Sequence, residues 1–401
     1  MDAQETADCP VRHFDHQAAI TEAELRKLHE ELLDEPTAVW SDAYGGFWLV
    51  SAYDHVRAGA MDYQHFSSAQ GVFFPEISGR PRSLGLEMDP PEHGKYRPLY
   101  AEFVSPRKLR EYEPMVRELT GDYVSQFVAN GGGDFVRSVS TKLPIQVIGR
   151  ALGFDADTAL RFFEVSDRMA HGEPAAIPEF FALCSQQIAA RRVEPVDDFL
   201  SYALTARIDD EPMSDEVLTA WLVGAVFAGH DTTLLSGAAL IKDLAVDSEL
   251  QDQVRHQPQL ISLAVTESLR LNSPVQRFFR VVTEDVDFAG VRMSAGDRVL
   301  LMYAAANLDG RRFTEPHRFK LDRDFTRHLG FGWGVHRCVG APLAQLELEI
   351  LADTMLRSCT FGLGSVPALG LPTAFGNFLG YDELMIRVER LGSIPDLSRT
   401  G

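Results

Sequence analysis

The sequence predicts a mainly α-helical protein with small β-sheets, folded as a single domain over residues 1–401. Residues 113–204 show predominantly helical periodicity, and residues 214–247 read as one long helix that is apolar nearly all round and therefore buried. Two segments, 38–51 and 291–302, carry aromatic and β-branched residues beside turn signals and predict hairpins. No internal repeat and no linker rich in Pro, Gly and Ser divides the chain.

The composition is that of an acidic globular protein. The chain has 58 Asp and Glu against 38 Lys and Arg, a formal net charge of -20, which argues against binding to nucleic acid or to an anionic membrane. Residues 1–15 lack an apolar core, and the apolar run 220–229 is too short to span a bilayer. We therefore expect a cytoplasmic protein without a membrane anchor, and the four scattered cysteines suit a reducing compartment.

The first quarter of the chain predicts an amphipathic helix over 15–37, the hairpin 38–51 and an irregular stretch over 66–86. A further helix begins near Asp89, because prolines are tolerated in a first helical turn. On that helix His93 and Arg97 are four residues apart, so they share one face and can both donate to a single anionic group.

The predicted helix over 214–247 has polar residues at its middle. A buried Asp231 beside Thr232 is costly unless both are hydrogen-bonded or used. Taken alone, a threonine bonded to a backbone carbonyl and an aspartate bonded to its neighbours is the usual explanation. The sequence assigns no role to His230.

The segment after this helix carries a possible ion pair and a strand. Glu267 and Arg270 are spaced for an i,i+3 pair on a helix. The chain then leaves the helix at Pro274 and enters a strand, in which neighbouring side chains point to opposite sides. Residues 373–391 predict a terminal hairpin.

Residues 331–340 form a glycine-rich loop that delivers Cys338, and a helix follows from Ala341. Glycines permit a backbone that approaches the sulfur closely, and the helix N-terminus favours a thiolate. This combination suits a haem iron held by a cysteine thiolate. A structural cysteine in a turn is the plainer alternative, and zinc is disfavoured because no second ligand pair lies nearby.

The loop 331–340 resembles the haem-binding signature of the cytochrome P450 family, Phe-Gly-x-Gly-x-His-x-Cys-x-Gly, at every specified position. The resemblance continues, in the family's order, through His93 to Arg97, Ala228 to Thr233 and Glu267 to Arg270. It covers almost the entire chain. It implies the family's triangular helical prism, with haem b (iron protoporphyrin IX) between the long central helix and the cysteine loop.

The resemblance also implies a role for each matching residue. Cys338 would ligate the iron, while Asp231 and Thr232 would deliver protons to dioxygen. The haem propionates would be held by His93, Arg97, Arg280 and His336, with Arg277 as a lower-ranked alternative to Arg280. Glu267, Arg270 and Arg323 would support the segment beneath the haem. Substrate contacts would come from Phe73, Phe74, Val223, Phe227, Val275, Phe278 and Phe378.

The activity implied by the resemblance is that of a soluble bacterial monooxygenase. It would insert one oxygen atom of O2 into a small hydrophobic or aromatic substrate, by hydroxylation or oxidative O-demethylation. Electrons would come from a ferredoxin and its NAD(P)H-dependent reductase, because no flavin or iron–sulfur segment is fused. A basic docking patch would consist of Arg107, Lys108, Arg110, Arg327 and Arg337.

Several hypotheses on the substrate and the activity remain open. Residues 80–83 and 274–280 are similar to members that oxidise para-substituted benzoic acids, but Phe227 stands where those members have a serine. A terpene hydroxylase is therefore an alternative. Two alternatives of other classes are a peroxide-driven peroxygenase, whose members replace the acid–alcohol pair kept here, and a non-catalytic haem-binding sensor.

Overall fold

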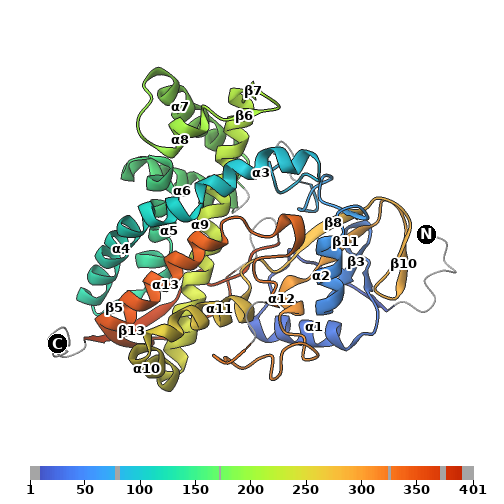
Figure 1. Ribbon diagram of the computed structural model, residues 1–401. Coiled ribbons are helices and arrows are strands. Elements are labelled where there is room, and N and C mark those ends of the chain that lie inside the picture. Colours follow the sequence, from blue (N-terminus) through green and yellow to red (C-terminus); the bar gives the residue numbers. More distant parts are fainter. Residues whose placement is uncertain (1–9, 77–81, 171–172, 324–326, 371–375, 391–401) are drawn as a thin grey trace.

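The computed structural model describes residues 10–76, 82–170, 173–323, 327–370 and 376–390. Helices predominate over small sheets, so the predicted fold class is confirmed. Most helices lie on one side of the molecule, the largest sheet lies on the other, and α9 passes between them (Figure 1). The helices are α1 Glu22–Asp34, α2 Tyr53–Met61, α3 Glu92–Phe103, α4 Pro106–Ala129, α5 Lys142–Leu152, α6 Ala156–Ala170, α7 Ala176–Val193, α8 Phe199–Ala203, α9 Asp215–Val246, α10 Ser248–His256, α11 Ile261–Asn272, α12 Tyr303–Ala306 and α13 Ala341–Ser358. The strands are β1 Val11–Arg12, β2 Val39–Ser41, β3 Phe47–Val50, β4 Phe66–Ser67, β5 Gly132–Asp134, β6 Arg207–Ile208, β7 Glu211–Pro212, β8 Phe278–Val282, β9 Val286–Phe288, β10 Val291–Met293, β11 Arg298–Leu301, β12 Cys359–Leu363 and β13 Met385–Arg390.

The central helix α9 matches the prediction for 214–247 almost to the residue. Ser214 caps its start by accepting a hydrogen bond from the Val217 amide at 3.3 Å. The helix packs against α5, α7, α11 and α13, and side chains such as Trp221 and Leu240 are buried. By length and apolar composition alone α9 is long enough to cross a membrane. Its burial among these helices is that of a core helix in a globular fold.

The largest sheet has the strand order β1-β2-β3-β11-β8-β4. The hairpin predicted over 38–51 is confirmed, since β2 and β3 pair antiparallel with Trp40 opposite Trp48. The hairpin predicted over 291–302 is wrong. β10 pairs with β9, whereas β11 lies between β3 and β8 in the large sheet. The carboxylate of Asp297, just before β11, accepts from the Trp48 indole at 3.0 Å and ties that end of the strand to the sheet.

The C-terminal strand β13 also has different partners from those predicted. The sequence predicted a hairpin within 373–391, of which residues 373–375 and 391 lie outside the described ranges. In the described part, β13 pairs antiparallel with β12 on one side and with β5 on the other. Within the stretch 113–204, which the sequence predicted as predominantly helical, Gly132–Asp134 thus forms a strand, because β5 joins this sheet.

A fully buried ion pair joins α11 to the chain that precedes the cysteine loop. Both carboxylate oxygens of Glu267 accept from the Arg270 guanidinium at 2.8 Å, and both side chains are 0% exposed. The same carboxylate accepts from Arg323 at 2.8 Å and from the Lys320 amide at 3.0 Å. The structure therefore brings together the three residues to which the family resemblance assigned a structural role.

Glu267→Gln is expected to lower the free energy of unfolding by roughly 3–5 kcal/mol, because it leaves two buried guanidinium groups without their negative partner. Urea unfolding followed by circular dichroism measures the loss. The exposed pair of Asp353 and Arg357 in α13 provides the control. Arg357→Ala should change the same quantity by less than about 1 kcal/mol. Equal losses in the two variants would contradict a special role for the buried pair.

Candidate functional site

Cys338 sits at the end of a loop that folds back on itself before α13 begins. Its amide donates to the Phe331 carbonyl at 2.8 Å, which closes the loop. Gly334 has a φ of +70°, and a Cβ there would lie 2.4 Å from the Ala60 carbonyl oxygen, so only glycine fits. Among the described cysteines, Cys184 and Cys359 are buried and Cys338 is exposed. The loop thus presents one accessible thiol.

Opposing influences act on the Cys338 thiol. Although the thiol is accessible, the protein around it shields it from bulk water and so raises the pKa of Cys338. Hydrogen bonds from the backbone of Gly340 and Ala341, together with the positive charges of Arg97 and Arg337, act in the opposite direction. These are the groups that would stabilise a thiolate once a cation was bound to it.

Basic side chains from three separate segments gather beside this loop. The rings of His93 in α3 and His336 in the loop lie 4.8 Å apart, centroid to centroid. Arg97 donates to the Arg337 carbonyl, and the charge of Arg280 in β8 acts on His336. Burial, with the neighbouring His336 and Arg97, lowers the pKa of His93 to about 4. The structure therefore brings together the four residues for which the resemblance implied propionate binding.

One acidic side chain lies beside this basic cluster: Oδ1 of Asp89 is 3.9 Å from Nε2 of His336. Within the described ranges His93, Arg97 and Arg280 form no ion pair, and the Nε2 atom of His93 is buried without a hydrogen-bond partner. Arg277, the lower-ranked alternative, instead donates to the Gly376 and His16 carbonyls at 2.9 and 3.1 Å. The guanidinium groups of Arg97 and Arg280 donate to backbone carbonyls but have no carboxylate partner, so they can also pair with a bound dianion such as two propionates.

The middle of α9 carries the predicted acid and alcohol. The Thr232 hydroxyl donates to the Ala228 carbonyl at 3.2 Å, one turn back along the helix. One carboxylate oxygen of Asp231, Oδ1, lies 2.8 Å from Nε2 of His230, and the other, Oδ2, is buried without a partner. Sequence reasoning missed His230, although a histidine next to an aspartate in an all-apolar helix is itself a signal of a buried pair.

A second acid that sequence reasoning missed is Glu347 in α13. Burial raises the pKa of Glu347 well above its usual value, and its Oε2 atom has no partner. It lines a small cavity together with Ser140 and Thr233. The buried neighbours at i-4 and i+4, Leu343 and Leu351, were the available signal, since they place Glu347 on the core face of its helix.

Most of the predicted substrate contacts lie in one aromatic cluster. The Phe378 ring lies 6.2 Å from that of Phe278, 6.4 Å from that of Phe227 and 6.5 Å from that of Phe73. Val275 packs against the same cluster. The structure therefore brings five of the seven predicted residues together.

The other two predicted substrate contacts lie elsewhere. The Phe74 ring packs against Phe279 at 5.4 Å, in the cluster on the other face of the sheet. Phe73 and Phe74 thus point to opposite sides, as do Phe278 and Phe279. Val223 packs against the main helical core, one turn before Phe227. Phe74 is therefore not positioned with the aromatic cluster.

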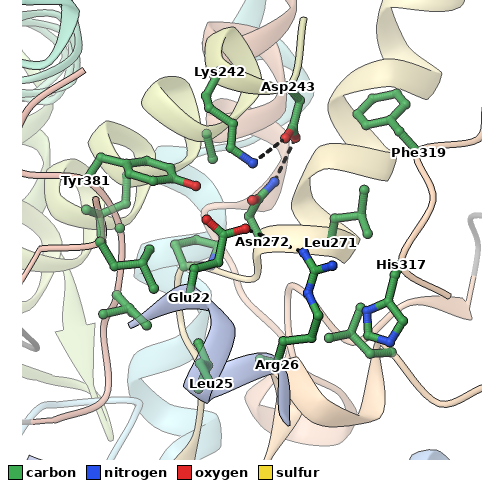
Figure 2. A pocket seen from close by; sticks show the side chains of 18 of the residues that line it. Glu22, Leu25, Arg26, Lys242, Asp243, Leu271, Asn272, His317, Phe319 and Tyr381 are labelled. Carbon is green, nitrogen blue, oxygen red and sulfur yellow. Dashed lines mark hydrogen bonds and ion pairs between the residues drawn. The ribbon is translucent and has the colours of Figure 1, made fainter. Parts of the chain in front are cut away.

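A cavity of about 310 Å³ opens elsewhere in the fold, between α1, α9 and α11. Figure 2 shows its polar side chains directed toward one another, with Lys242 and Asn272 both reaching Asp243. Leu235 lines this cavity and also packs against the aromatic cluster. None of the residues predicted to bind cofactor or substrate lines it, so it is separate from the site built around Cys338.

The site combines an accessible thiol at a helix N-terminus, a basic cluster that can bind an anion, and a polar break in a long apolar helix. Within the described residues, no group of three or more His, Cys, Asp or Glu side chains could hold a metal ion by itself. A single thiolate with a basic cradle is the ligand arrangement of a haem-thiolate protein.

Comparisons with known proteins agree with this class. Residues 175–368 match the family described as Cytochrome P450. The chain is 33% identical to the mycinamicin IV hydroxylase/epoxidase of Micromonospora griseorubida, over 80% of this chain and 85% of that protein. It is also 33% identical to the vitamin D(3) 25-hydroxylase of Pseudonocardia autotrophica, over 88% and 87% of the two chains. The solved structure of cytochrome P450 CYP109Q5 from Chondromyces apiculatus superposes with a TM-score of 0.85, at 27% identity, and covers 95% of this chain and 99% of that one.

The chain therefore belongs to the cytochrome P450 family and is a monooxygenase of that family. The resemblance recognised in the sequence is confirmed. Membership implies a haem with a cysteine thiolate ligand.

Arg280→Met is expected to lower the haem content of the purified protein, because it removes one of the unpaired cations offered to the propionates. The ratio of Soret to protein absorbance after chromatography measures that content. Arg292 in β10 is exposed and lies near Asp285 and Asp287, so Arg292→Met serves as the control. An unchanged ratio in the Arg280 variant would remove this residue from the haem site.

Proposed function

We propose that this protein uses a non-covalently held haem b to insert one oxygen atom of O2 into a small apolar or aromatic substrate. The observation that carries the proposal is the accessible Cys338 beside Arg97 and Arg280, whose guanidinium groups form no ion pair within the described residues. The other two described cysteines are buried in α7 and β12, which favours a haem held without thioether bonds. We also propose that residues 1–401 act as one catalytic domain.

Two groups of residues have separate proposed roles, one in holding the haem and the other in delivering protons. When bound, the haem supplies oxygen-activating chemistry, and electron density from the Cys338 thiolate favours O–O cleavage. His93, Arg97, Arg280 and His336 would hold its propionates. The buried network around Glu267 keeps the segment before the loop in place. The protein thus contributes binding, orientation and electrostatics.

Asp231 and Thr232 are proposed to supply protons. The Thr232 hydroxyl makes one long hydrogen bond, to a carbonyl of its own helix, so it can turn to another acceptor at little cost. The unpartnered Oδ2 of Asp231 is available to take a proton from water and to pass it on. An acid and an alcohol at adjacent positions on one helix therefore form a short route for protons.

The aromatic cluster supports a compact, apolar substrate. Phe73, Phe227, Phe278 and Phe378 bring ring faces and edges together and exclude water from that side of α9. Hydroxylation or oxidative O-demethylation of a small aromatic molecule is the proposal, and hydroxylation of a terpene is the alternative. The relatives include a mycinamicin IV hydroxylase/epoxidase and a vitamin D(3) 25-hydroxylase, so they do not favour one of these two substrate classes over the other.

We propose a ferredoxin, with its NAD(P)H-dependent reductase, as the electron donor. The five basic residues of the docking patch expected from the sequence differ in whether they form ion pairs in the structure. Arg107 and Lys108 are paired with Glu111, and Arg107 also with Glu102, whereas Arg337 is exposed beside the thiol. Docking is therefore expected to centre on Arg337. The unpaired cysteines suit a reducing compartment, so a cytoplasmic location is part of the proposal.

The dithionite-reduced, carbon monoxide-bound protein is expected to show the strongly red-shifted Soret band of thiolate-ligated haem. Cys338→Ser should abolish this band, because it removes the thiolate. Cys359→Ser is the control, since Cys359 is a buried thiol in β12 whose contact to the Met355 carbonyl a serine can keep. A histidine-type Soret band in the parent protein, or a red shift that survives in Cys338→Ser, would contradict the assigned ligand.

Thr232→Ala is expected to uncouple NAD(P)H oxidation from product formation and to raise peroxide release, because the proton-donating hydroxyl is lost. Peroxide and NAD(P)H are measured with a surrogate ferredoxin system. Thr354→Ala in α13 is the matched control, since the Thr354 hydroxyl also donates one turn back, to Ile350 at 2.7 Å. Unchanged coupling in Thr232→Ala would remove its proposed role and would favour a peroxygenase or a sensor.

A further inference from the structure

We propose that His230 is a positioning residue for proton delivery: as an imidazolium it holds Oδ1 of Asp231 and leaves Oδ2 for proton transfer. The inference rests on the proposed roles of Asp231 and Thr232 and goes beyond them. It concerns a residue at a position to which the sequence assigned no function.

The first step is the state of the ring. Nδ1 of His230 lies 3.3 Å from the Val226 carbonyl oxygen, and an oxygen of this kind can only accept, so Nδ1 carries a proton. Nε2 lies 2.8 Å from Oδ1 of Asp231. A lone pair on Nε2 at that distance from a carboxylate oxygen would be repelled. The contact is therefore that of an ion pair between a protonated ring and a carboxylate, held by charge and proximity, since no aligned N–H···O hydrogen bond joins the two atoms.

The second step is the surroundings of the ring. The side chain of His230 is 0% exposed, and the Phe163 ring of α6 lies against it edge to face at 5.9 Å. Burial lowers the pKa of His230, but the charge of Asp231, the contacts to Asp231 and Val226, and the charge of Asp167 on α6 raise it above its usual value. The charged groups that act on His230 within the described residues are thus both negative, and they favour the imidazolium.

The third step is the consequence for Asp231. Its Oδ1 is engaged by a rigid, fully buried ring on the same helix, so the carboxylate cannot rotate freely about its χ2 angle. Its Oδ2 is buried and has no partner. The pair therefore presents one oxygen in a fixed direction. A proton that Oδ2 takes from water and passes to Thr232 leaves the proton on Nε2 in place, so the pair returns to its starting state.

The pair is tested directly by the titration of His230. The protein is labelled with 15N-histidine and studied in its reduced, carbon monoxide-bound form, which is diamagnetic. His230→Gln assigns the signal. In the parent protein His230 should titrate above 6.5, and in Asp231→Asn below 6.5, because only burial then remains as the dominant influence. A value below 6.5 in the parent, or no decrease in Asp231→Asn, would overturn the proposal.

The ion pair also has a signature in stability. Since the folded pKa of His230 is raised, the pair's contribution to stability is complete below the ordinary histidine pKa of 6.5 and is lost as the pH rises through the folded value. The difference in unfolding free energy between the parent protein and His230→Gln should therefore shrink over that range. A difference that does not depend on pH would mean that the ring only fills space.

The effect on function is measured as coupling, the amount of product formed and of peroxide released for each NAD(P)H oxidised. His230→Gln keeps the size and one N–H donor but lacks the charge, and peroxide released per NAD(P)H should rise by about tenfold. 4-Methoxybenzoic acid and limonene serve as probes. His256→Gln is the matched control, because His256 makes the same contact to the carbonyl one turn back, Asp252 at 2.8 Å, but is exposed.

The outcomes separate the two proposals. Uncoupling in both Thr232→Ala and His230→Gln, with an unchanged His256→Gln, supports the positioning role. Uncoupling in Thr232→Ala alone overturns the role of His230 and leaves the proposed function intact. If neither variant uncouples, proton delivery from this helix fails and the positioning role fails with it, whatever the titration of the ring shows.

Discussion

The buried ion pair of α11 is the interaction on which the cysteine side of the structure depends. Arg270 donates to the Asn307 carbonyl at 2.7 Å, and the Asn307 side chain in turn accepts from the Leu329 amide at 2.6 Å. The Leu329 carbonyl then accepts from Gly332, inside the loop that ends at Cys338. This continuous set of hydrogen bonds connects a helix in the core to the cysteine loop, in which Gly334–His336 forms a single 3-10 turn. A buried pair of charges with complete hydrogen bonding is rigid, and that rigidity is what a thiolate ligand needs.

In the central helix α9, by contrast, the charged residues serve chemistry and not rigidity. Most of α9 is apolar and buried, which is a stable arrangement, yet its middle holds a charged pair and two threonines. Removing ions from water costs free energy that a buried pair recovers only partly, so replacement of His230 and Asp231 by apolar residues would be neutral or favourable for stability. Their presence is therefore better explained by chemistry than by folding. Stability comes from the flanks of α9, and function from the few residues at its centre.

The sequence predicted correctly those elements whose pattern lies within a short stretch of neighbouring residues. The helix over 214–247 and the loop ending at Cys338 depend on local periodicity and on glycines at fixed spacings, so both were predictable. Strand partners depend on residues far apart in the chain, and the predicted hairpin over 291–302 was wrong because Asp297 and the buried β11 belong to the large sheet. The orientation of Phe74 also required three-dimensional packing, which no local pattern contains, whereas the His230–Asp231 contact had a local signal that sequence reasoning did not use.

The incompletely satisfied polar atoms around α9 and the cysteine loop connect the two halves of the site. A buried polar atom without a partner costs about 1–3 kcal/mol, and a folded protein retains few of them. Two such atoms lie in the basic cluster, Nε2 of His93 and Nδ1 of His336, and Oδ2 of Asp231 is one of those in the central helix. A histidine nitrogen can donate to a cofactor propionate, and a carboxylate oxygen can accept from water on its way to Thr232. The polar atoms on the two sides of the site therefore fit the two proposed roles, cofactor binding and proton delivery.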